Sequence, residues 1–251
     1  SMAGSSQQLP SYVALQGEVS TVAGIVEKVE QDLIIAEQAV ADNLESVYKE
    51  VKPLADAASD PTKDAAYIAA YTKLIGARNA LTASEADYKK AYDFIDNLTA
   101  DHDAYELKAG YAGVVTAISN LLDSMQQGYD ERTLTSAAIT SAIDGYSEMI
   151  KSAIQVVFND AAKAGEPLEE GLDITPLFEH MGYAWGTSQV AFSNGYPAEN
   201  PVWMNESKTG TFKTNYSTAE VWDARPFNIY REFKGLPKGK YTIKVHALYR
   251  S

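Results

Sequence analysis

Aromatic and polar side chains suited to binding a sugar lie close together in the last third of the sequence. Glu220, Trp222, Asp223 and Arg225 fall within six residues, and Trp203 follows a stretch with a tyrosine, a glutamate and an asparagine. Sugars expose C–H faces that stack on aromatic rings, and their hydroxyl groups bond to carboxylate and guanidinium groups. We therefore predict a carbohydrate site at these five residues. The alternative is that the rings fill a small β-core.

Residues for catalysis or metal binding are few. The three histidines, His102, His180 and His246, do not pair at the spacing of metal ligands. The chain has no cysteine, which excludes disulfides, thiolate zinc sites and cysteine nucleophiles. The motifs of serine hydrolases, zinc proteases, phosphate-binding loops and dinucleotide sites do not occur. We therefore expect a protein that is not an enzyme and that has no metal and no cofactor.

The charge of the chain is concentrated in its first two thirds. The net charge is −13 over 251 residues, with 12 basic and 24 acidic residues before residue 166, and 9 basic and 10 acidic residues from there on. Such an acidic region repels nucleic acid and anionic membranes, so we expect neither as its partner. No apolar run is long enough to span a bilayer. Membrane attachment would therefore need an anchor outside these residues.

One continuous helix is predicted for residues 12–54. Apolar residues recur there in steps of three and four, with one extra step of four between Val40 and Leu44. This pattern forms the seam of a helix packed on other helices, and one extra step relaxes the supercoil without ending the helix. The seam consists of Tyr12, Leu15, Val19, Val22, Val26, Val29, Leu33, Ala36, Val40, Leu44, Val47, Val51 and Leu54.

Three further helices are predicted before residue 165. Asp60 and Pro61 are typical of a helix start, and apolar spacing continues to residue 98. Thr82 and Ser84 could cap a fresh start near residue 82, but the unbroken spacing favours one helix. Seams over residues 107–125 and 139–157 predict two more helices. Because the connections are short, neighbours should be antiparallel. We expect an α+β multidomain fold, with an antiparallel four-helix, coiled-coil-like bundle followed by a β-sandwich or jelly roll.

Short β-like segments follow residue 173. All three tryptophans and 14 of the 26 aromatic residues lie there, and residues 240–250 alternate between apolar and polar side chains. We divide the chain into four parts. Residues 1–10 are the remnant of a cleaved tag with a flexible start, residues 11–165 the helical stalk, residues 166–172 a linker and residues 173–251 the β-sandwich.

The last third resembles a known module. Residues 219–222 read Ala-Glu-Val-Trp, an aromatic-rich segment follows at 227–233, a Gly-Leu-Pro-Lys-Gly turn lies at 235–239, and Ala-Leu-Tyr-Arg lies at 247–250. These features are similar to the galactose-binding-like jelly-roll domains of secreted and surface proteins of Bacteroidota. The start at residues 173–178 is also similar, whereas Gly-Tyr-Ala-Trp at 182–185 departs from the usual Gly-Trp. In that family the module often follows a helical stalk.

The resemblance implies a non-catalytic, extracellular or cell-surface protein in adhesion or carbohydrate binding. Two alternatives remain: an accessory region of a larger glycan- or peptide-degrading enzyme, or a structural module that binds a protein. The expected partner is a glycan or a surface protein of a host or a bacterium.

A jelly roll needs about eight strands, whereas residues 173–251 offer four or five. We therefore expect residues 173–251 to be the N-terminal part of a longer domain. A retained fragment or a strand-sharing second copy would then pair with residues 240–250, unless an unusual compact sheet takes the place of the missing strands.

Overall fold

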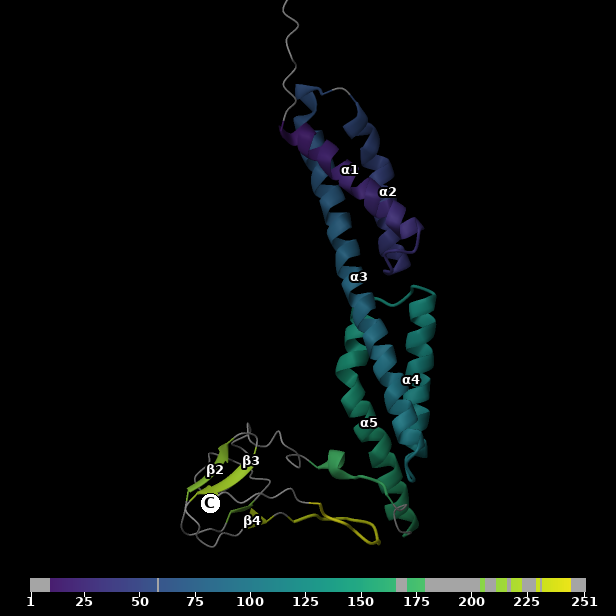
Figure 1. The fold of residues 1–251 in the computed structure, drawn as a ribbon, viewed down its shortest axis with the longest axis vertical. Coiled ribbons are helices and arrows are strands. Elements are labelled where there is room, and N and C mark those ends of the chain that lie inside the picture. The colour runs from purple at the N-terminus through teal and green to yellow at the C-terminus, as the bar shows by residue number, and fades with distance from the viewer. Residues whose placement is uncertain are drawn as a thin grey trace, which may run out of the picture. The chain divides into compact units, whose positions relative to one another are not determined.

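The computed structural model describes residues 10–57, 59–165, 171–178, 204–205, 211–215, 218–222, 229–230 and 232–244. Two compact units are found, residues 1–103 with 118–146, and residues 104–117 with 147–251. The helices of the described residues are α1 (Pro10–Glu30), α2 (Gln38–Asp56), α3 (Asp64–Glu106), α4 (Ala112–Asp130) and α5 (Ser136–Ala164) (Figure 1). Among them, none is both long and apolar enough to span a membrane.

In the first unit, α1, α2 and the first half of α3 pack as a three-helix bundle (Figure 1). The apolar seams predicted for these helices point inward. Because each seam excludes water along one stripe, the three stripes close one core. Its residues with less than 3% of their surface exposed include Tyr12, Leu15, Val22, Leu44, Tyr67, Leu74 and Leu81.

The prediction of one helix over residues 12–54 is wrong, because the chain reverses between α1 and α2. Asp32 adopts a left-handed conformation with φ of 55°. Its N–H bonds to the carbonyl oxygen of Val29, and the N–H of Leu33 bonds to that of Lys28. These two bonds form a Schellman motif that ends α1. Leu33, predicted to lie in the seam, is 66% exposed.

The start and continuity of α3 agree with the sequence. The carboxylate of Asp60 accepts a hydrogen bond from the backbone N–H of Thr62, and Pro61 opens a short 3-10 turn, Pro61–Lys63, before α3. The helix then runs without a break for 43 residues. At 1.5 Å per residue it is about 65 Å long.

The second half of α3 packs with the parts of α4 and α5 that belong to the first unit (Figure 1). Tyr146 of α5 lies edge-on to Phe94 of α3, with ring centroids 5.6 Å apart, and its hydroxyl donates to Asp101. Tyr129 of α4 packs at 5.4 Å from Tyr88 of α3. The predicted four-helix bundle is therefore wrong: α3 is shared by two sets of three helices.

In the second unit, the end of α3 is joined to α4 through an aromatic loop. Tyr105 and Tyr111 pack with ring centroids 4.9 Å apart, and Lys108 lies over both rings. The hydroxyl of Tyr111 accepts a hydrogen bond of 2.6 Å from the N–H of Asp173. Leu107, predicted as the start of a buried seam, is 89% exposed. Residues 171–178, which include the 3-10 turn Thr175–Leu177, thus contact this loop.

The predicted β-sandwich is not seen in the described residues. Strand β1 (Met204–Asn205) pairs with β4 (Ile229–Tyr230), and β2 (Thr211–Asn215) pairs with β3 (Thr218–Trp222), both antiparallel. These are two separate two-stranded ladders, whereas a jelly roll packs two larger sheets face to face. Residues 240–244, predicted as a strand, belong to no ladder, and residues 245–250 lie outside the described residues.

Candidate functional site

The five residues predicted to bind a sugar are only partly described. Trp203, Asp223 and Arg225 lie outside the described residues. Glu220 and Trp222 lie on β3, and their Cα partners on β2 are Lys213 and Thr211. Positions two apart share one face of a strand. The backbone therefore brings Glu220 and Trp222 to the same face of this hairpin, and a carbohydrate site there stays a prediction.

The histidines form no pair in the described residues. His102 lies near the end of α3, with its ring Nδ1 3.3 Å from a carboxylate oxygen of Asp103. His180 and His246 lie outside the described residues. His102 is the one histidine that is described, and the expectations of no metal and no catalysis stay predictions.

A polar cluster lies at the middle of α3, where two loops meet it. Ser84 Oγ accepts a hydrogen bond of 2.9 Å from the N–H of Glu37, at the start of α2. One helical turn later, the hydroxyl of Tyr88 accepts a bond of 3.0 Å from the N–H of Leu134, just before α5. The first N–H groups of a helix have no partner within the helix. One turn of α3 therefore holds the entries to two other helices, and we name residues 84–88 with these two loops the junction.

Arg132 connects the two loops of the junction to each other. Like Asp32, it has a φ of 55° and ends its helix, α4, with a Schellman motif. Its Nε donates to the carbonyl oxygen of Ala36 at 2.9 Å, and its own carbonyl oxygen accepts from the N–H of Gln38 at 2.8 Å. Its Nη1 lies 4.0 Å from a carboxylate oxygen of Asp32. The loop after α4 is therefore bonded to the loop after α1.

Asp87 adds a charged contact to the junction. Its carboxylate accepts a 2.8 Å hydrogen bond from Lys90 Nζ. The side-chain hydrogen bond from Lys90, and after it that from Ser136 at the start of α5, hold the pKa of Asp87 below its ordinary value.

The depressed pKa of Asp87 predicts acid-sensitive stability. A lowered folded-state pKa contributes stability above the unfolded-state pKa of about 3.9, and this contribution is lost as the pH falls through the folded-state value. In Asp87→Asn, the free energy of unfolding should be lower by about 1 kcal/mol at pH 7 and close to that of the parent at pH 2. Urea unfolding at both pH values measures it. Asp96→Asn, at an exposed position of the same helix, is the control, and an equal effect of both changes would contradict the assignment.

A buried ion pair joins α1 to α3 in the first unit. Arg78 Nε lies 2.9 Å from Glu18 Oε1, and the Glu18 side chain is only 8% exposed. Neither atom has a hydrogen bond to another group of the described residues. The buried carboxylate of Glu18 therefore depends on Arg78 for compensation, whereas the side chain of Arg78 is 30% exposed to water.

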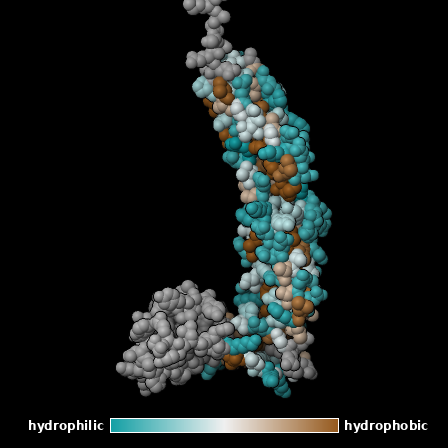
Figure 2. Space-filling view, in the orientation of Figure 1, coloured by the Kyte–Doolittle hydropathy of each residue, from teal (hydrophilic) through white to brown (hydrophobic). Residues whose placement is uncertain are grey.

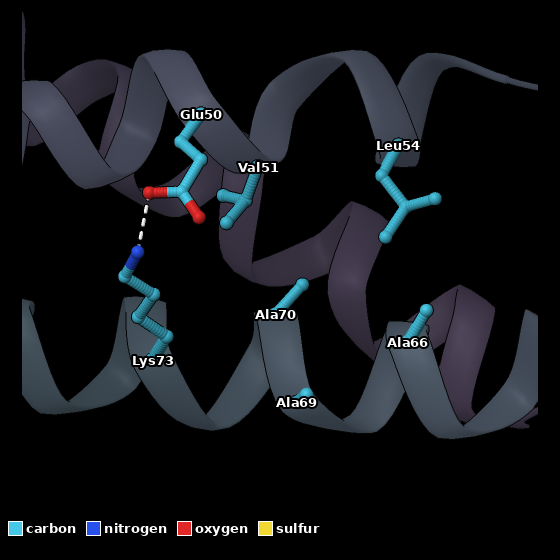
Figure 3. A pocket seen from close by; sticks show the side chains of 7 residues that line it. All are labelled: Glu50, Val51, Leu54, Ala66, Ala69, Ala70 and Lys73. Atoms are coloured by element: carbon cyan, nitrogen blue, oxygen red, sulfur yellow. Dashed lines mark hydrogen bonds and ion pairs between the residues drawn. The ribbon is translucent and has the colours of Figure 1, made fainter.

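Two shallow grooves lie on the first unit. One, of about 300 Å³, lies between α2 and α3, and Figure 3 shows Lys73 of α3 reaching Glu50 of α2 beside the alanines of α3 that line the groove. The other, of about 250 Å³, lies between α1 and α2 beside Arg132, and its lining includes Glu30, Asp32, Asp42 and Glu45. Neither groove is lined by a serine, a cysteine or a histidine.

Sequence analysis did not identify the junction as a functional feature. Ser84 was recognised as a possible cap, but the helix whose start it caps is α2 and not a second half of α3. Its signal was a small polar residue within an apolar seam, buried to 5% exposure. Arg132 gave no signal, since a lone arginine in a turn is ordinary on a surface.

Comparisons with models of protein families, with curated proteins and with solved structures found no match. The resemblance to galactose-binding-like domains of Bacteroidota is therefore corrected on two grounds: no family supports it, and the described residues are mainly helical with no β-sandwich. What the structure establishes is that helices predominate in the described residues and that two sets of three helices share α3.

Proposed function

We propose that this chain is part of a non-catalytic, extracellular or cell-surface protein of the adhesion or carbohydrate-binding type, in which the first unit acts as a stiff spacer. The observation that carries the spacer is the junction. Ser84 and Tyr88 of α3 hold the entries to α2 and α5, and Arg132 bonds the two loops together.

The bonds of the junction oppose bending at the middle of α3. Bending there would break the buried hydrogen bond between the N–H of Leu134 and the hydroxyl of Tyr88. Leaving a buried donor unsatisfied costs about 1–3 kcal/mol. Helix α3 also has no proline and no bulge at this point, and these two features are usual causes of a kink.

The surface of the helices fits a spacer in solvent. Figure 2 shows hydrophilic residues over most of the visible helical surface, with hydrophobic residues in separate patches. Together with the acidic excess of the first 165 residues, this surface favours solubility and discourages association between copies of the same charge.

Distances between spin labels test the stiffness of the first unit. The chain has no cysteine, so Ser20→Cys on α1 and Ser124→Cys on α4, both exposed, can be labelled without background. We expect a single narrow distance distribution. The control is Ala80→Cys with Asn97→Cys, two exposed positions within α3 alone, about 26 Å apart along the helix. A distribution for the first pair much broader than for the control, or with two maxima, would overturn the spacer.

A glycan array on the protein tests the carbohydrate part of the proposal. Trp222→Ala should abolish binding while the helical circular dichroism and the melting temperature stay unchanged, because the proposal gives the Trp222 ring a role in ligand binding and not in the fold. Trp185→Ala is a matched control for loss of a tryptophan outside the predicted site. The absence of binding to any glycan by the parent protein would contradict a carbohydrate ligand, and the spacer would still be judged by the label distances.

A further inference from the structure

Residues 232–244 combine positive charge with exposed apolar side chains. Lysines occupy positions 234, 238, 240 and 244, against one acidic residue, Glu232, in a chain with a net charge of −13. The side chain of Ile243 is 75% exposed and that of Tyr241 is 39% exposed. Burial of apolar surface is the main favourable term in folding and association. These two side chains are therefore available to a partner.

The start of this segment is held in place. Gly235 has a φ of 73°, which only glycine adopts readily, and the turn that follows buries Pro237. The hydroxyl of Tyr241 donates to the carbonyl oxygen of Pro237. Phe233 packs edge-on against Phe178, with ring centroids 4.9 Å apart. Residues 240–244 therefore extend from an anchored turn and yet belong to no β-ladder.

The order of side chains in residues 240–244 is that of a strand. Lys240, Thr242 and Lys244 occupy one set of alternating positions, and Tyr241 and Ile243 the other. We propose that these five residues, the docking strand, pair with an extended segment of another protein. That segment carries carboxylates opposite the two lysines and apolar residues opposite Tyr241 and Ile243.

Charge excludes a second copy as the preferred occupant. An antiparallel pair of docking strands centred on Thr242 places Lys240 of each copy opposite Lys244 of the other, and like charges directly opposite are destabilising. Lysines on an edge strand also protect natural proteins against self-pairing. The lysines therefore favour an acidic partner over a second copy, and a strand shared between copies stays a prediction that the test below addresses.

The apolar residues favour a polypeptide over an anionic glycan. An added strand gains main-chain hydrogen bonds and also covers alternate side chains. Cross-strand pairs of aromatic and β-branched residues are among the stabilising ones. Tyr241 and Ile243 supply one half of such pairs, whereas a purely ionic partner would leave Ile243 in water.

The test uses the whole chain and labelled peptides. The probe has the core Glu-Val-Thr-Ile-Glu, which places a carboxylate opposite each lysine, and the comparison peptide has the core Lys-Val-Thr-Ile-Lys. Fluorescence anisotropy should show the acidic peptide binding at least roughly tenfold more tightly. Amide hydrogen exchange should slow at residues 240–244 on binding. The absence of saturation by the acidic peptide up to about 1 mM would overturn the proposal.

Two sets of variants separate strand pairing from simple charge attraction. The double change Lys240→Glu with Lys244→Glu should reverse the peptide preference, while Lys28→Glu with Lys89→Glu, at exposed positions of α1 and α3, should not. Neighbouring N–H groups of a strand point to opposite edges. Of the two changes Thr242→Pro and Ile243→Pro, one should therefore weaken binding of the acidic peptide at least roughly tenfold. If the acidic peptide bound the Thr242→Pro and Ile243→Pro variants with the same affinity, its binding would rest on charge attraction alone. If the parent chain formed a dimer without peptide, it would pair with itself. Either result overturns the proposal.

Discussion

Tyr88→Ala should lower the free energy of unfolding by about 3–5 kcal/mol, the loss typical of a large buried ring. Tyr88 is 1% exposed, packs against Tyr129 at 5.4 Å and accepts the hydrogen bond from the N–H of Leu134. The change therefore leaves a cavity at the junction and a buried donor without a partner. Urea unfolding followed by circular dichroism at 222 nm measures the loss.

Tyr88→Phe separates the two contributions of this side chain. The ring stays, so only the acceptor for Leu134 is lost, and the expected cost falls to about 1–3 kcal/mol. Burial, partly offset by the bond from Leu134, raises the pKa of Tyr88. The unfolded chain therefore ionises first, and the Tyr88 contribution is lost as the pH rises above about 10. The phenylalanine variant should lose less stability there, and an equal alkaline loss would contradict this role of Tyr88.

Arg78→Met should lower the free energy of unfolding by about 2–3 kcal/mol. The change leaves the carboxylate of Glu18 buried without its partner, and removing one member of a buried pair typically costs about 3–5 kcal/mol. The expected value is lower because the side chain of Arg78 is 30% exposed, so water screens the pair. Chemical denaturation at pH 7 measures the change.

A double-mutant cycle checks that the loss comes from the pair. Glu18→Leu together with Arg78→Met should be nearly as stable as the parent, because both charges are removed and apolar residues replace them. Glu18→Leu alone should cost less than Arg78→Met alone, since Arg78 reaches water. Single changes whose effects simply add in the double variant would show that no energetic coupling links Glu18 to Arg78.

The helical periodicity predicted which residues are buried better than it predicted where helices end. Tyr12, Leu15, Val22, Leu44 and Val51 are buried as expected. The reversal after α1 escaped detection because seven residues, 31–37, separate α1 from α2. Seven residues make one heptad, so the three-four pattern keeps its phase across the loop.

The last third of the chain shows what the alternation of side chains cannot predict. The alternation of residues 240–250 predicted a strand, yet residues 240–244 belong to no ladder, whereas β3, which was not predicted, pairs with β2. Alternation does not show which strands pair, because the pattern of side chains along one strand is the same whichever strand lies beside it. The number of strands in a sheet and its partner strands are therefore tertiary properties, and the family resemblance could not supply them.

The sequence by itself determined the helical class of residues 10–165, the cap at Asp60 and the unbroken course of α3, because each depends on residues near in sequence. Only the tertiary structure decided that two sets of three helices share α3 and that Ser84, Tyr88 and Arg132 join them. These residues act on backbone groups 46 to 96 positions away. Local propensity cannot encode such contacts, since they form only when packed helices bring orphan N–H and carbonyl groups within reach of a side chain.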